Sequence, residues 1–131
     1  MIEVRGSIDA PAAVAWRLLI DTEAWSRWGP SVRAVKSPAR LIGPGSRGKL
    51  QTSLGVWVPF SVEGWRDGEY WRWRVAGIPA TGHEVIPVGP GSCEVRFSIP
   101  GWAPFYRPVC ALAIRRISAL ARARRGTGSG D

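Results

Sequence analysis

Apolar and polar residues alternate along much of the chain, and this alternation predicts β-strands. Residues 2–8 follow the pattern, as do short runs between residues 32 and 99. Six runs are clear and a fainter one lies at 32–40. Strands with one apolar and one polar face are typical of an antiparallel sheet that is covered on one side. Glycine-rich turns separate the runs at 43–45, 66–69 and 89–91. The apolar faces are expected to include Leu50, Leu54, Val56, Val58, Phe60, Val62, Trp71, Trp73, Cys93, Val95, Phe97 and Ile99.

Two short helices are expected after the first strand. Pro11 begins a stretch of helical spacing over 11–21. A second, shorter helix carries Trp25 and Trp28, and Gly29-Pro30 ends it because proline and the residue before it resist helical continuation. Either Asp21 or Thr22 is expected to provide its N-terminal cap.

A long helix is expected over 102–124, bent or delayed by Pro108. It is the only element long enough to cover the apolar face of the sheet. The resulting fold class is α+β, with one domain over 1–125 and a disordered tail over 126–131. The apolar stripe of the helix is expected to contain Phe105, Val109, Leu112, Ala113, Ile117 and Leu120.

Composition supports a globular, cytoplasmic protein. Hydrophobic residues make up 45% and charged residues 21% of the 131 residues, close to the globular average. We see no secretory signal and no apolar run that could span a bilayer. The two cysteines, Cys93 and Cys110, are therefore expected to be buried free thiols. The unusual feature is the presence of eight tryptophans.

The net charge of +8 lies mostly at the C-terminal end. From Arg107 onward the chain has six arginines and one acidic residue. Such a region can attract phosphates or anionic lipid, although a solvated helix face is the commoner explanation. Nucleic acid is not favoured as a partner, since Arg72 and Arg74 alternate with tryptophans that point to the opposite face of the sheet.

Candidate catalytic residues are few. His83, the only histidine, shares a strand face with Val85 and is expected to point inward, where it either accepts a proton or has a structural role. The acidic residues fall on polar faces, in turns or at helix ends, and no metal, phosphate or dinucleotide motif is present. We therefore expect neither a cofactor nor a metal, and a binding cavity is favoured over a reaction chamber.

The sequence resembles the START-related Bet v 1-like (SRPBCC) superfamily, and within it the bacterial polyketide cyclase/dehydrase group. The resemblance rests on "IDAPAAVAWRLLIDTEAWSRWGPSV", "GPGSRGKL", "YWRWRVAGIPATGHEV", "GPGSCEVRFSIP" and the closing basic helix, and covers residues 1–125. It implies a helix-grip fold, in which a seven-stranded antiparallel sheet wraps around the C-terminal helix. An apolar cavity would lie between them, with the two short helices at its mouth.

On this basis the protein is expected to bind a hydrophobic, lipid- or polyketide-like small molecule. Either Trp25 and Trp28 line the void and keep an indole N–H for the guest, or they fasten the short helices to the sheet. One alternative is an aromatase/cyclase or dehydratase with His83 as general base. Another is a basic module that binds an acidic partner or a membrane surface through the C-terminal helix. In each of these roles the protein is expected to be a monomer or a homodimer. The expected lining is Trp25, Trp28, Phe60, Trp73, His83, Phe97, Phe105 and Val109.

Overall fold

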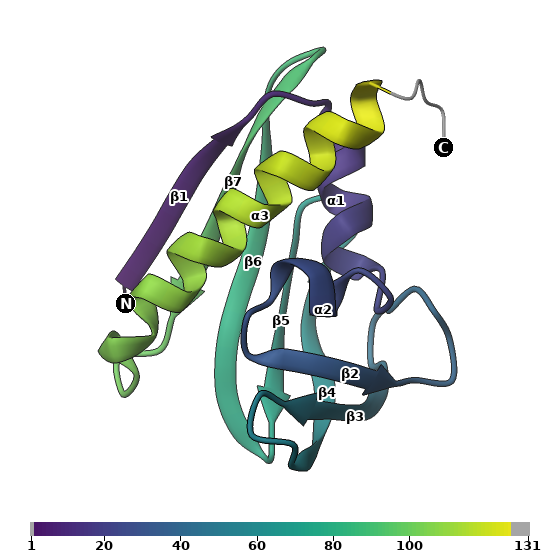
Figure 1. Ribbon diagram of the computed structural model, residues 1–131, viewed down its shortest axis with the longest axis vertical. Helices are drawn as coiled ribbons and strands as arrows, with labels where there is room; N and C mark the ends of the chain where they lie inside the picture. Colours follow the sequence, from purple (N-terminus) through teal and green to yellow (C-terminus); the bar gives the residue numbers. More distant parts are fainter. Residues whose placement is uncertain (1, 127–131) are drawn as a thin grey trace.

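The computed structural model describes residues 2–126 and contains one seven-stranded antiparallel sheet in the order β1-β7-β6-β5-β4-β3-β2 (Figure 1). This arrangement confirms the predicted α+β helix-grip architecture, and β2 is the faint strand candidate. The elements are β1 (Ile2–Ile8), α1 (Ala12–Ile20), α2 (Trp25–Trp28), β2 (Val32–Lys36), β3 (Arg47–Thr52), β4 (Trp57–Arg66), β5 (Tyr70–Val75), β6 (Ile78–Gly89), β7 (Ser92–Ile99), the 3-10 helix η1 (Pro104–Tyr106) and α3 (Arg107–Gly126).

Helix α3 crosses the sheet and packs against β1, α1 and α2 (Figure 1). Its approach to β1 is close: a Cβ added at Gly6 would stand 2.5 Å from Ile114 Cγ2. Glycine at this position therefore sets how near the helix lies to the sheet. The buried stripe of α3 consists of Cys110, Ala113, Ile114, Ile117 and Ala121.

The long helix begins later than the sequence predicted. The chain forms η1 at 104–106 before α3 starts at Arg107, which places Pro108 in the first turn of α3, where its missing N–H costs no hydrogen bond. The predicted apolar stripe was wrong at two positions. Phe105 lies in η1 and is 71% exposed, and Leu112 on the helix is 37% exposed.

The turn between β3 and β4 also departs from the predicted alternation. Gly55 has a φ of +86° and donates its N–H to the carbonyl of Thr52, which closes a tight turn. Leu54 and Val56 were expected on the apolar face of the sheet. The turn instead leaves Leu54 89% and Val56 57% exposed.

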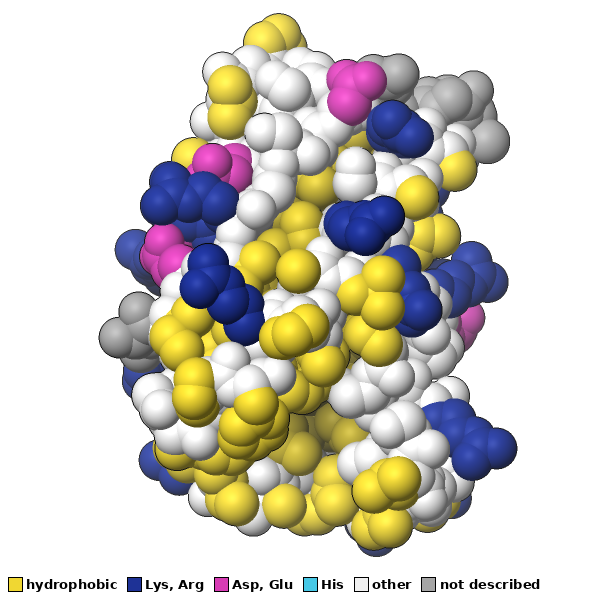
Figure 2. All heavy atoms as spheres, turned by 60° about the vertical axis from the view of Figure 1, so that its left-hand side comes forward, with side chains coloured by type: hydrophobic (Ala, Val, Ile, Leu, Met, Phe, Trp, Pro, Cys, Tyr) yellow, Lys and Arg dark blue, Asp and Glu magenta, His cyan; other side chains and the backbone are white. Residues whose placement is uncertain are grey.

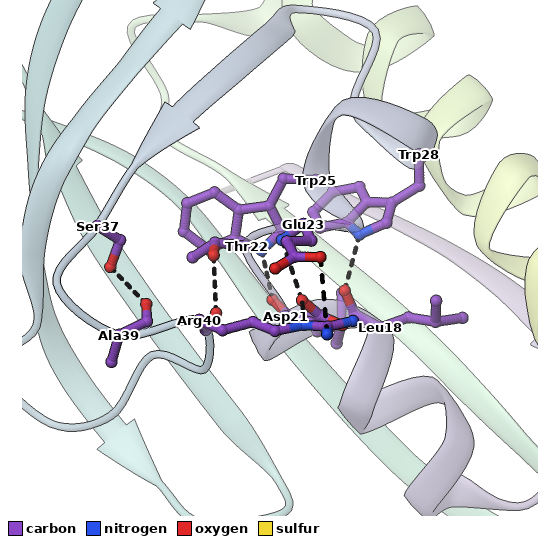
Figure 3. A network of polar contacts seen from close by, with 10 residues as sticks. Leu18, Asp21, Thr22, Glu23, Trp25, Trp28, Ser37, Ala39 and Arg40 are labelled. Atoms are coloured by element: carbon purple, nitrogen blue, oxygen red, sulfur yellow. Dashed lines mark hydrogen bonds and ion pairs between the residues drawn. The ribbon is translucent and has the colours of Figure 1, made fainter. Parts of the chain in front are cut away.

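Asp21 holds a loop in place and does not cap α2. The N-terminal cap of α2 is Ala24, without a side-chain hydrogen bond. The buried Asp21 carboxylate accepts hydrogen bonds from Arg40 Nε and Nη2, each at 3.0 Å, and from the Glu23 backbone N–H at 3.0 Å (Figure 3). Burial alone would raise the pKa of Asp21, but these hydrogen bonds and the Arg40 charge outweigh it and lower the pKa.

The described residues contain no helix long and apolar enough to cross a bilayer, and no cluster of His, Cys, Asp and Glu that could hold a metal. Cys93 and Cys110 are both buried and unpaired. The tail predicted over 126–131 begins with Gly126, which ends α3; residues 127–131 lie outside the described part of the chain.

Candidate ligand-binding pocket

The indole N–H groups of Trp25 and Trp28 close the C-terminal end of α1 (Figure 3). The last carbonyls of a helix lack intrahelical partners. Trp28 Nε1 donates to the carbonyl of Leu18 at 2.8 Å, and Trp25 Nε1 donates to that of Leu19 at 2.9 Å. The next carbonyl, of Ile20, accepts from the backbone N–H of Ile42. Neither indole N–H is therefore free for a guest, and leucine could not replace tryptophan at 25 or 28 without leaving buried carbonyls unpaired.

Trp25 is packed among other rings. Its indole stacks on Trp71 with 5.7 Å between ring centroids, and meets the edges of Phe60 at 5.3 Å and Trp73 at 5.2 Å. Trp25, Phe60 and Trp71 are each at most 3% exposed. This cluster makes the region beneath α2 a solid core, so the structure favours the fastening role for Trp25.

Two adjoining hollows remain between the sheet and the segment that leads into α3. The inner hollow has a volume of about 40 Å³, and Trp28, His83, Phe97 and Val109 are among its lining residues. A cavity of about 150 Å³ accommodates benzene, so the inner hollow has room for water but not for a ring. It is therefore too small to be the main site for a ligand.

The outer hollow is larger, with a volume of about 360 Å³. It lies between β2, β3, β5 and β6 on one side and the segment 99–106 on the other. It adjoins the inner hollow, since Ser31, Val32, Trp73, Thr81 and Tyr106 line both. Figure 2 shows a hollow on this face of the molecule with hydrophobic side chains in and around it. Its other lining residues are Leu50, Thr52, Ser53, Leu54, Val75, Ala80, Ile99, Pro100, Trp102, Ala103 and Phe105.

A directed chain of hydrogen bonds runs behind the boundary between the hollows. His83 Nδ1 lies 3.3 Å from the carbonyl of Trp71, which can only accept, so Nδ1 carries the hydrogen. His83 Nε2 then accepts from the Thr81 hydroxyl at 2.9 Å, and Thr81 Oγ1 accepts from Trp73 Nε1 at 3.2 Å. Both nitrogens of His83 are thus occupied. Thr81 Oγ1 keeps one lone pair at the edge of both hollows.

A second polar pair stands at the same boundary. The hydroxyls of Ser31, after α2, and Tyr106, at the end of η1, hydrogen-bond to each other. Burial raises the pKa of Tyr106, so the phenol stays protonated at neutral pH. With Thr81, these two residues give the hollows three hydroxyl groups at the point where they meet.

The pocket is electrically neutral. Neither hollow is lined by Lys, Arg, Asp or Glu. Burial lowers the pKa of His83 from 6.5 to about 3, which keeps the imidazole neutral, and burial raises the pKa of Cys110 to about 11, which keeps its thiol protonated. An ionised guest would find no partner inside the pocket, and the lining offers no charged acid or base.

The structure distributes the eight expected lining residues over three places. Trp25, Trp28, His83, Phe97 and Val109 border the inner hollow, Trp73 borders both, Phe105 borders the outer one, and Phe60 lies in the aromatic core outside these two hollows. Most residues that line the outer hollow were not predicted from the sequence. Thr81 could have been found, because the period of two places it on the same strand face as His83. The roles of Ser31, Trp102 and Tyr106 depend on where α3 begins, which the helical spacing did not reveal.

Solved structures of other proteins share this fold. Protein MLL2253 from Mesorhizobium loti matches with a TM-score of 0.71 at 11% identity, over 93% of this chain and 96% of that one. Protein CV1439 from Chromobacterium violaceum matches with a TM-score of 0.61 at 21% identity, over 92% of this chain and 95% of that one. Norcoclaurine synthase from Thalictrum flavum, in complex with dopamine and hydroxybenzaldehyde, matches with a TM-score of 0.63 at 13% identity, over 98% and 88%.

At these identities the likeness establishes the fold alone. No curated protein matches the sequence. The family model described as polyketide cyclase / dehydrase and lipid transport, however, matches residues 1–124. That match spans nearly the whole chain, including every residue that lines the two hollows. The chain therefore belongs to the polyketide cyclase/dehydrase and lipid transport family.

Proposed function

We propose that this protein binds a neutral, mostly apolar small molecule in the outer hollow, with one polar end directed at the boundary with the inner hollow. The observation that carries the proposal is an apolar chamber of about 360 Å³ whose charge-free lining ends in three hydroxyl groups. Ligand pockets typically combine an apolar lining with a few polar groups that fix orientation. The family description, which names lipid transport, is consistent with such a guest.

The polar end of the guest is expected to be a hydroxyl or a carbonyl. Thr81 Oγ1 keeps a lone pair that accepts from a guest hydroxyl. The Ser31–Tyr106 pair has one hydroxyl hydrogen that its own hydrogen bond does not use, and this hydrogen can be donated to a guest carbonyl. A carboxylate in this position would lose its hydration without gaining a cation. Its burial would therefore cancel much of the affinity that the apolar contacts supply.

Binding is favoured over catalysis by the state of His83. A general base needs a free nitrogen and a pKa near the working pH. Both nitrogens of His83 are hydrogen-bonded within the protein, and burial lowers its pKa to about 3. The cyclase or dehydratase hypothesis remains the alternative. It predicts that His83→Gln abolishes turnover of a polyketide-like substrate, whereas the binding proposal predicts only a small change in ligand affinity.

The test uses 1-decanol and decanoate, which differ mainly in the charge of the polar end. Calorimetric titration at pH 8 is expected to give one site for decanol. Each buried methylene contributes about 0.8 kcal/mol, so ten carbons set an upper limit of about 8 kcal/mol, which corresponds to a Kd of about 1 μM. Decanoate is expected to bind at least tenfold more weakly. Equal or tighter binding of decanoate would contradict the neutral-guest proposal.

A pair of variants locates the site. Ala80→Phe places a ring in the outer hollow and is expected to abolish decanol binding. Ala39→Phe makes the same change on an exposed loop and is expected to leave binding unaltered. Thermal unfolding by circular dichroism checks that both variants are folded. Retained affinity in folded Ala80→Phe would exclude the outer hollow as the site.

A further inference from the structure

Exposed apolar side chains gather at the mouth of the outer hollow. Leu54 in the β3–β4 turn is 89% exposed, Phe105 in η1 is 71%, Trp102 is 57% and Ile78 at the start of β6 is 49%. Leu54, Trp102 and Phe105 also line the hollow, and Ile78 is next to Pro79, whose carbonyl accepts the indole N–H of Trp102 at 3.2 Å. We call these four residues the apolar rim. A rim of this kind around a cavity mouth is typical of a surface that contacts a partner or a membrane.

The net charge around the apolar rim is positive. The segments 31–33, 50–56, 73–81 and 99–107 contain three arginines and no acidic residue. Arg74 is engaged by Glu63 at 2.8 Å. Arg33 and Arg107 are exposed and form no ion pair within the described residues. Figure 2 agrees, because the acidic side chains visible in that view lie away from the hollow.

Arg33 and Arg107 flank the rim on two sides. Arg107 follows η1 by one residue and lies two positions after Phe105. Arg33 reaches toward the β3–β4 turn, since a Cβ built on Gly55 would stand 3.8 Å from its Nη1. Gly55 is the neighbour of Leu54 in the chain. The rim therefore combines side chains suited to the acyl boundary of a bilayer with cations suited to its headgroups.

We propose that the apolar rim, together with Arg33 and Arg107, docks on an anionic phospholipid surface. Trp102 fits this role because its N–H is held by the protein while its ring remains exposed at the mouth. A second copy of the chain is a poorer occupant, since a two-fold contact through the rim would bring four unpaired arginines together. Docking turns the mouth of the hollow toward the bilayer. A guest could then pass between the bilayer and the hollow. Only this last step rests on the proposed function.

The test measures flotation of the protein with vesicles made of equal parts phosphatidylglycerol and phosphatidylcholine, against vesicles of phosphatidylcholine alone. We expect binding to the anionic vesicles at 0.05 M salt and its loss at about 0.5 M, where charges are screened within a few ångströms. Each arginine near an anionic surface contributes about fivefold in partition. Arg33→Gln with Arg107→Gln is therefore expected to weaken binding about 25-fold.

Matched controls separate the rim from the rest of the surface. Arg116→Gln with Arg122→Gln removes the same charge from α3, and is expected to weaken binding less than threefold. Leu54→Ser with Phe105→Ser is expected to lower partition at least tenfold. Val88→Ser, which changes a 72% exposed residue at the opposite end of β6, is expected to have no effect.

Three results would overturn the proposal: no flotation with anionic vesicles, equal losses in the rim and α3 variants, or a rim variant that turns a dimer into a monomer without affecting vesicle binding. The decanol titration keeps the two proposals apart. Arg33 and Arg107 do not line the hollow, so their double variant is expected to bind decanol normally. Loss of vesicle binding with intact decanol binding supports docking. Decanol binding without flotation removes docking alone, and flotation without decanol binding removes the ligand proposal alone.

Discussion

Replacing Trp25 and Trp71 by phenylalanine, one at a time, tests whether the indole at position 25 has a structural role. Both side chains are at most 1% exposed and stack on each other. Each change removes the same atoms from the same cluster. Each variant is therefore expected to lose the same packing contribution to the free energy of unfolding, about 2 kcal/mol.

The two variants differ in the hydrogen bond of the indole. Trp25 Nε1 donates to the carbonyl of Leu19, so Trp25→Phe leaves that buried oxygen unpaired and costs about 1.5 kcal/mol more. Trp71 Nε1 is buried with no hydrogen-bond partner, so Trp71→Phe removes an unsatisfied donor and regains about 1.5 kcal/mol. The expected losses in free energy of unfolding are about 3.5 kcal/mol for Trp25→Phe and about 0.5 kcal/mol for Trp71→Phe.

Urea unfolding followed by far-ultraviolet circular dichroism measures this difference without relying on tryptophan fluorescence. The gap of about 3 kcal/mol corresponds to about 10 °C in Tm for a domain of this size. Equal destabilisation by the two changes would refute the reasoning, because packing alone would then account for both tryptophans.

Three further changes test other parts of the structure. Gly6→Ala is expected to cost about 1–3 kcal/mol, since the new methyl would overlap Ile114, while Gly43→Ala meets no atom within 4 Å and is expected to be neutral in the same unfolding assay. The pKa of His83 is about 3 in the folded protein and 6.5 in the unfolded chain, so its contribution to stability is complete above pH 6.5. Below pH 6.5 the free energy of unfolding is expected to fall by about 1.4 kcal/mol per pH unit because of this residue. His83→Gln is therefore expected to reduce the pH dependence of the free energy of unfolding between pH 6.5 and 5. Because the pKa of Asp21 is lowered on folding, its contribution to stability is complete above its ordinary pKa of 3.8 and is lost as the pH falls below that value. The free energy of unfolding of Asp21→Asn is therefore expected to depend less on pH below 3.8 than that of the unchanged protein.

The alternation of residues predicted the sheet well because most strands have one buried face. In β7, every second residue from Cys93 to Ile99 is buried, and β1 has the bounds expected from the sequence. The same logic correctly placed His83 inward. It failed at Leu54, where the chain turns, because a period of two cannot tell the end of a strand from its continuation.

The candidate site was harder to predict than the fold. Its position depends on η1, which delays α3 and carries Phe105 and Tyr106 to the mouth of the outer hollow. The helical spacing of apolar residues did not reveal the short 3-10 helix that begins at Pro104 and ends before Pro108. The indoles of Trp25 and Trp28 were assigned correctly to the interior, but their N–H groups close the end of α1, and a pairing between side chain and backbone leaves no periodic signal.

The indole signals in a two-dimensional ¹H–¹⁵N spectrum provide the most direct test that the outer hollow takes a neutral apolar guest. Trp73 and Trp102 line the hollow, whereas Trp16 and Trp65 pack against each other and line neither hollow. On titration with 1-decanol, the signals of Trp73 and Trp102 are expected to shift to saturation at one equivalent while those of Trp16 and Trp65 stay in place. Unchanged signals of Trp73 and Trp102, or shifts that never saturate, would contradict the account.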